Sequence, residues 1–215
     1  EVRNIEAPTP TGGGGVSTMD AARLRTPESI ESASYLGMMY SAGLGTAVDY
    51  QEAMRWFRKA AEQGDALSQF HLGLAYISGK GVERNHAEAT SWLRKAAYQE
   101  VPAAQFYLGR LYQEGEGVAP EADTAVKWYR KAAAQGYADA QFYLGRALLA
   151  GEGAERNPAE GRAWLEKAAA QKHAKRKHLN KKQGVAEGNL QEFAPGGGGD
   201  DDRNRRIDKL IDIAV

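Results

Sequence analysis

The four tryptophans of this chain are evenly spaced, and their spacing limits the fold more than any other feature. Trp56, Trp92, Trp128 and Trp164 lie 36 residues apart. The Leu-Gly pairs, the paired loop glycines and the Lys-Ala-Ala triplets recur at the same interval of 36 residues without an insertion. Their first copies begin at residues 36, 43 and 59, respectively. Such a register indicates four copies of one supersecondary unit, and each copy must stack on its neighbours to bury its apolar face.

Each unit is predicted to hold two helices. In the second unit, apolar residues at helical spacing predict a first helix from Ala66 to Ser78, in which Gly73 lets a neighbouring helix approach closely. Gly79 and Gly81 then end this helix, because glycine tolerates the positive φ of a helix C-cap. The second helix is expected to open at Asn85 and to end near Gln99.

The starts of the second helices carry capping signals. Asp49 with Glu52, Asn85 with Glu88 and Asn157 with Glu160 have the spacing of a capping box, whereas the third unit has Glu121 with Thr124 and predicts a looser start. Alanines and aromatic residues then recur on one face, where each tryptophan is expected to fill the space between helices. The predicted class is therefore an all-α solenoid of four 36-residue helix-turn-helix repeats.

These residues resemble the Sel-1-like repeat family, a relative of the tetratricopeptide repeat. Residues 104–109 look like its first-helix motif, 115–118 like its loop and 125–133 like its second helix, and the resemblance covers about residues 30 to 172. It implies a right-handed α-α superhelix used as an adaptor or scaffold in protein complexes. One cysteine-rich branch is linked to β-lactam binding and hydrolysis, and this chain lacks the paired cysteines of that branch.

Composition narrows the range of functions. Lys plus Arg and Asp plus Glu both total 28, which argues against nucleic acid as the main partner. The absence of cysteine removes disulfides and thiolate zinc sites. The four histidines share no metal-site spacing, the repeated Gly-x-Gly never follows a strand, and no catalytic motif appears, so we expect no cofactor and no enzymatic activity. No apolar run is long enough to span a membrane.

A partner is expected to bind where packing leaves the first helices free. In solenoids these helices usually line the concave surface. Its N-terminal half is apolar, and its C-terminal half combines tyrosine with arginine, which suits a protein or peptide with an acidic segment. The plain alternative is that the neighbouring Phe70, Phe106 and Phe142 pack between repeats and the arginines are solvated. The predicted groove residues are Tyr35, Met38, His71, Leu74, Ile77, Tyr107, Arg110, Gln113, Tyr143, Arg146 and Leu149.

The ends of the chain differ in composition from the repeats. Residues 1–25 are interpreted as a flexible tail, with Thr26 and Pro27 opening the first ordered helix, so the repeats occupy residues 26–172. Residues 173–195 are interpreted as a degenerate polar cap. Residues 196–215 are interpreted as a glycine linker and a short amphipathic helix. The basic cluster that begins at Lys172 is either solvated or meets an acidic surface or nucleic acid.

The predicted function is a non-catalytic protein-interaction scaffold. Two alternatives stay open, namely a β-lactam-directed hydrolase and a structural component that self-associates through residues 203–214. The chain begins with Glu1, so both a cytoplasmic protein and an exported one that has lost a signal peptide are compatible with the sequence.

Overall fold

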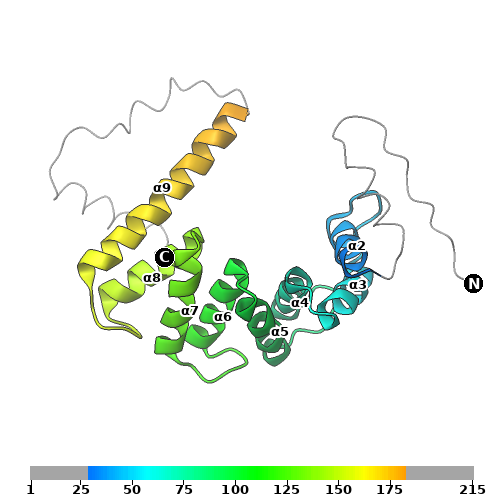
Figure 1. Cartoon of the computed structure of the whole chain (residues 1–215), viewed down its shortest axis with the longest axis horizontal. Coiled ribbons are helices and arrows are strands. Elements are labelled where there is room, and N and C mark those ends of the chain that lie inside the picture. Colours follow the sequence, from blue (N-terminus) through cyan, green and yellow to red (C-terminus); the bar gives the residue numbers. More distant parts are fainter. Residues whose placement is uncertain (1–28, 183–215) are drawn as a thin grey trace, which may run out of the picture. The chain divides into compact units, whose positions relative to one another are not determined.

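The computed structural model describes residues 29–182, and within that range all regular structure is α-helical (Figure 1). The four helices that open the repeats, here called A helices, are α2 (Ile30–Ala42), α4 (Ala66–Ser78), α6 (Pro102–Glu114) and α8 (Ala138–Ala150). The four that close them, the B helices, are α3 (Tyr50–Glu62), α5 (His86–Tyr98), α7 (Ala122–Ala134) and α9 (Pro158–Lys182). The predicted all-α fold of repeated helix pairs is confirmed.

The chain divides into two compact units. The first contains residues up to Ala104 and the loop Glu116–Val118, and the second contains Gln105–Gly115 and the chain from Ala119 onward. In the first unit α2, α3, α4 and α5 pack in sequence order, and in the second α8 packs between α7 and α9. Consecutive packing is what a solenoid requires, because each helix pair forms a wall of the next core.

The glycine of each Leu-Gly pair lies where an A helix meets the B helix of its own repeat. A Cβ on Gly73 would lie 2.5 Å from Cγ of Leu93, closer than carbon atoms tolerate. Gly109 stands in the same relation to Tyr129, with 2.7 Å to its ring. The absence of a side chain therefore sets the distance between the two helices, as the sequence predicted for Gly73.

The paired loop glycines have two separate roles. Gly79 is the left-handed C-cap of α4, with φ 74°, as predicted. Gly117 instead brings its loop onto the start of the preceding B helix, since a Cβ there would lie 2.3 Å from the carbonyl group of His86. Gly153 makes the same approach to Ala122. The first glycine of the repeated Gly-x-Gly therefore ends the A helix, and the second packs against the preceding repeat.

The predicted N-caps are mostly confirmed. Asp49 accepts a hydrogen bond from the backbone N–H of Glu52, and Asn85 accepts two at the start of α5. Glu121 makes no capping hydrogen bond through its side chain, as expected for the third unit. Asp65, which caps α4 through the N–H of Ser68, was not predicted.

Buried glutamines join successive repeats. The amide nitrogen of Gln69 donates to the carbonyl oxygen of Ala61 at the end of α3, and its oxygen accepts from Gln99 at 2.8 Å. Gln141 and Gln171 repeat this arrangement in the second unit. The amides satisfy carbonyl groups that a helix end leaves without intrahelical partners.

The tryptophans lie between helices, but only Trp128 is buried, and the other three are half-buried. In every repeat the lysine three residues later places its ammonium group within about 6 Å of the ring, as Lys95 does over Trp92 at 3.9 Å. The lysine of each Lys-Ala-Ala triplet therefore lies over the ring of the preceding tryptophan.

α9 differs from the other B helices because it is 25 residues long instead of 13. The earlier B helices end before a left-handed residue, which is Gly64 (φ 100°), Glu100 (φ 62°) or Gly136 (φ 84°). The corresponding position in the fourth repeat is Lys172, and the helix continues through it into the segment interpreted as a cap. Thr26, Pro27, both tails and residues 203–214 lie outside the described residues.

Candidate interaction surface

The eleven predicted groove residues all lie on the A helices, and none of them is fully buried. In the first unit Tyr35 and Met38 keep 45% and 37% of their surface exposed, whereas His71, Leu74 and Ile77 are half-buried. The intervening Leu72, Leu108 and Leu144 are fully buried. Packing therefore uses one set of A-helix positions and leaves the neighbouring stripe accessible.

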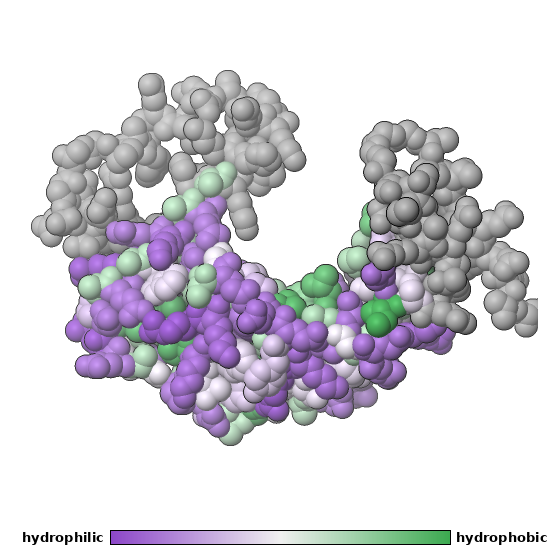
Figure 2. Space-filling view, in the orientation of Figure 1, coloured by the Kyte–Doolittle hydropathy of each residue, from purple (hydrophilic) through white to green (hydrophobic). Residues whose placement is uncertain are grey.

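The accessible surface of the first unit is richer in apolar side chains. Figure 2 shows the strongest hydrophobic colouring over α2, α3 and α4, while the visible face of the second unit is mostly hydrophilic. Tyr35 and Met38 contribute to it from α2, and Leu67 contributes from α4. The exposed large hydrophobic side chains lie on the first unit, and the groove itself stays a prediction.

His71 is less available to a partner than its position suggested. Its imidazole stacks on the ring of Phe57 at 4.7 Å and also contacts Phe70. Burial lowers the pKa of His71, because the charged form loses water, and Asp65 opposes this shift. His71 is therefore a half-buried residue of the aromatic packing.

In the second unit, Phe106 is the centre of an aromatic cluster. Its buried ring contacts Tyr107, Tyr137 and Tyr143, each with ring centroids 5.3 Å apart. The alternative that Phe106 packs between repeats is thus correct, whereas Phe70 and Phe142 are half-buried. Tyr107 and Tyr143 are held by this ring with part of their surface accessible.

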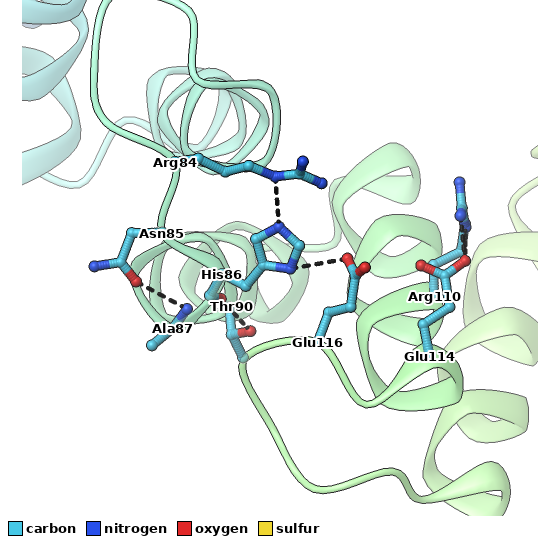
Figure 3. Close-up of polar contacts among 8 residues, drawn as sticks. All are labelled: Arg84, Asn85, His86, Ala87, Thr90, Arg110, Glu114 and Glu116. Atoms are coloured by element: carbon cyan, nitrogen blue, oxygen red, sulfur yellow. Dashed lines mark hydrogen bonds and ion pairs between the residues drawn. The ribbon is translucent and has the colours of Figure 1, made fainter.

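The remaining polar groove residues of the second unit differ in their contacts within the chain. Arg110 forms an ion pair with Glu114, one helical turn later on α6, and its Nε donates to the carboxylate at 2.9 Å (Figure 3). Gln113 accepts a hydrogen bond from the hydroxyl of Tyr129 at 2.6 Å. Arg146 is exposed and lies over the ring of Phe142. The two arginines predicted to act together therefore have different environments.

One polar link was not predicted from the sequence. The Nε of Arg84 donates to Nε2 of His86 at 2.9 Å, and Nδ1 of His86 lies 2.8 Å from the carboxylate of Glu116 (Figure 3). All three belong to the first unit. The link holds the Glu116–Val118 loop against the start of α5, so it reinforces the approach made by Gly117.

Two open hollows occur at equivalent positions of the second and fourth repeats, with volumes of about 630 and 430 Å³. In the first, Arg58 donates to the hydroxyl of Tyr76 at 2.6 Å, and in the second, Arg130 pairs with Glu160. Both hollows are lined mainly by charged loop and helix-start residues of mixed sign. Across residues 29–182, no group of three His, Cys, Asp or Glu residues is placed to hold a metal ion.

The structure thus defines a class, the α-helical repeat proteins built from stacked helix pairs. The Sel1 repeat family matches residues 30–65, 66–101, 102–137 and 138–173, which together make up more than half of the chain. The chain belongs to the Sel1 repeat family. Proteins of this family are generally protein-interaction scaffolds, and no curated protein matches this chain.

Two solved structures are similar to it. One is a protective antigen of uropathogenic Escherichia coli strains with an SLR fold, at 38% identity and a TM-score of 0.67, over 73% of this chain and 34% of the antigen. The other is a Sel1 repeat protein from Oxalobacter formigenes, at 34% identity and a TM-score of 0.65, over 71% of this chain and 64% of that protein. The chain spans less than two thirds of either relative. In the part that the structure describes, no helix is both long and apolar enough to cross a membrane.

Proposed function

We propose that this protein is a non-catalytic adaptor that holds a peptide or protein segment against its A helices. The observation that carries the proposal is that those helices use one set of positions for packing and leave another set accessible. The leucine and glycine that recur at every step are buried in the second, third and fourth repeats, and the positions beside them stay accessible and change from repeat to repeat. A solenoid stacks through its invariant positions and specifies a partner through the variable ones.

The chemistry of the variable positions supports a peptide partner. Tyr35 and Met38 offer exposed apolar surface on the first unit. Tyr107 and Tyr143 on the second unit offer rings whose orientation the cluster around Phe106 already fixes. Aromatic side chains with few rotatable bonds dominate binding energies because they lose little entropy on binding.

A direct test selects peptides from a random library on the immobilised protein and measures hydrogen exchange with and without the selected peptide. We expect slower exchange in the A helices, and about tenfold weaker binding for Tyr107→Ala, since truncating a buried aromatic contact costs about 1–2 kcal/mol. Tyr98→Ala, which removes an exposed tyrosine from a B helix, is the matched control. Protection confined to B helices, or equal loss in both variants, would refute the proposal.

The non-catalytic part of the proposal has its own test. The described polar pairs hold helix ends and loops together, as His86 and Glu116 do. We therefore expect no hydrolysis of a chromogenic cephalosporin above the rate in buffer. Turnover that survives repurification and disappears on heat denaturation would establish the hydrolase alternative instead.

A further inference from the structure

We propose that Arg146 and Lys172, which share the ring of Phe142, form a subsite for the carboxylates of an acidic peptide. This inference rests on the proposed adaptor function and names the chemistry of the partner at one place on the second unit. The three residues are called the 142–172 subsite below.

The two cations of the subsite come from different helices. The guanidinium carbon of Arg146, on α8, lies 5.9 Å from the centre of the Phe142 ring, and the ammonium nitrogen of Lys172, on α9, lies 5.5 Å from it. Both cationic side chains are exposed, and Phe142 is half-buried. Neither cation pairs with a carboxylate of the described residues. Their charges are therefore available to an anion from outside.

The sequence around each cation explains why it has no internal partner. Arg110, the equivalent of Arg146 in the third repeat, pairs with Glu114 four residues later. The residue four positions after Arg146 is Ala150, so α8 supplies no acid at that distance. The fourth repeat thus keeps the arginine of the third repeat and lacks its carboxylate.

Lys172 reaches the ring only because α9 continues. In the three earlier repeats this position is a left-handed residue after the end of the B helix, at Gly64, Glu100 and Gly136. The preceding residue, Gln171, donates from its amide nitrogen to the oxygens of Gln141 and Gly136, at 3.0 Å each. These hydrogen bonds fix α9 against the start of α8 immediately before Lys172. Gln99 makes the equivalent hydrogen bonds in the second repeat, so the feature particular to the fourth repeat is the helix that continues through Lys172.

An acidic peptide fits this arrangement better than other anions. Both cations lie within about 6 Å of one ring, so a segment that carries several carboxylates is attracted by each of them. The planar guanidinium can hold a carboxylate by two parallel hydrogen bonds, while the ammonium group of lysine acts as a point charge. The apolar edge of Phe142 and the neighbouring Tyr143 suit the hydrocarbon part of a peptide, and Tyr143 belongs to the predicted groove.

The test measures the affinity of the full chain for a fluorescent peptide that carries a run of glutamates next to leucine. A peptide with glutamine at every glutamate position is the comparison, and a single-stranded oligonucleotide of equal charge is the third probe. The variant is Arg146→Gln with Lys172→Gln. The control, Arg162→Gln with Lys167→Gln, removes the same charges from exposed positions of α9 away from Phe142. Circular dichroism verifies that both variants stay helical.

We expect the wild-type chain to prefer the glutamate peptide, and the Arg146/Lys172 variant to bind it about tenfold more weakly, as two exposed charge pairs allow. The control should stay within about twofold of wild type, and added salt should erase the preference. Equal affinity for the glutamate and glutamine peptides, or equal loss in the control, would overturn the subsite. If such a peptide still bound and Tyr107→Ala still weakened it, the adaptor function would stand without the subsite. Tighter binding of the oligonucleotide would assign the two cations to nucleic acid and refute the inference.

Discussion

Gly73 offers the sharpest test of how the repeats hold together. Alanine is the better helix former by about 1 kcal/mol, so Gly73→Ala would stabilise an isolated helix. In this structure the new Cβ would lie 2.5 Å from Cγ and 2.7 Å from Cδ2 of Leu93. Overpacking of this kind costs about 1–3 kcal/mol, and the backbone oxygen of Ala89 at 3.4 Å limits any sideways movement. After the gain in helix propensity is subtracted, we expect a net loss of up to about 2 kcal/mol in the free energy of unfolding.

A double-mutant cycle identifies the cause of that loss. Leu93 is fully buried, so Leu93→Ala alone should cost about 2–5 kcal/mol through the cavity it leaves. In the double variant, the methyl group added at position 73 occupies part of that cavity without a clash. The combined loss should then be smaller than the sum of the single losses by about 1–3 kcal/mol.

The measurement is urea unfolding followed by circular dichroism, with Ser91→Ala as a control. Ser91 is exposed on α5, two residues from Leu93, so its replacement changes helix propensity without changing the contact. A Gly73→Ala protein more stable than wild type by about 1 kcal/mol, as helix propensity alone predicts, would refute the close-approach argument. Strict additivity of the two substitutions would refute it as well.

Three further predictions concern buried or paired polar groups. Because burial lowers the pKa of His71, the unfolded chain binds its proton more readily, so the free energy of unfolding should fall as pH drops below about 6.5, and His71→Phe should weaken this dependence. Gln141→Leu removes the hydrogen bond to Ala133 and the one from Gln171, while Ala133 and Gln171 each keep a second hydrogen bond with Gly136, and should cost about 1 kcal/mol by urea unfolding. The pKa of Glu160 is lowered by hydrogen bonds from Arg130 and then from Trp164, so stability from this group is present above about pH 4.5 and is lost as pH falls further. Arg130→Ala should make stability fall less steeply below about pH 4.5, and should lower the free energy of unfolding at neutral pH by at most about 1 kcal/mol. Melting curves recorded at a series of pH values measure both effects.

The repeat register was readable from the sequence because stacking uses the same residue types at every step. Gly73 and Gly79 were assigned their roles correctly, since a glycine inside a helix marks a close approach and one directly after a helix marks a left-handed cap. Asp49 and Asn85 were assigned as N-caps because their side chains suit the free N–H groups of a first turn. Caps and close approaches depend on the residue type at one position and its near neighbours in the chain, so the sequence alone was enough to predict them.

What the sequence did not reveal depends on contacts between distant positions. The hydrogen bond from Gln69 to Ala61 joins neighbouring repeats, and the one from Gln99 to Gln69 joins positions 30 residues apart within one repeat. A glutamine that returns at positions 105 and 141 was nevertheless a visible signal. The lysine three residues after each tryptophan was equally visible. The link from His86 to Glu116 had no sequence signal, because histidine stands at that position in one repeat only.

The departures from the repeat therefore carry more functional information than the repeat itself. Positions that keep their identity at every step are occupied by packing, as Leu72 and Leu108 are. A position that changes is free to do so because the fold does not need it. Two such changes meet in the fourth repeat. Ala150 stands where the third repeat has Glu114, so the partner of the arginine is missing, and Lys172 stands where the earlier repeats have a turn residue, so a second cation lies near the Phe142 ring. Two exposed cations beside one ring attract carboxylates from outside the repeats, so the fourth repeat is the place to look for a negatively charged partner.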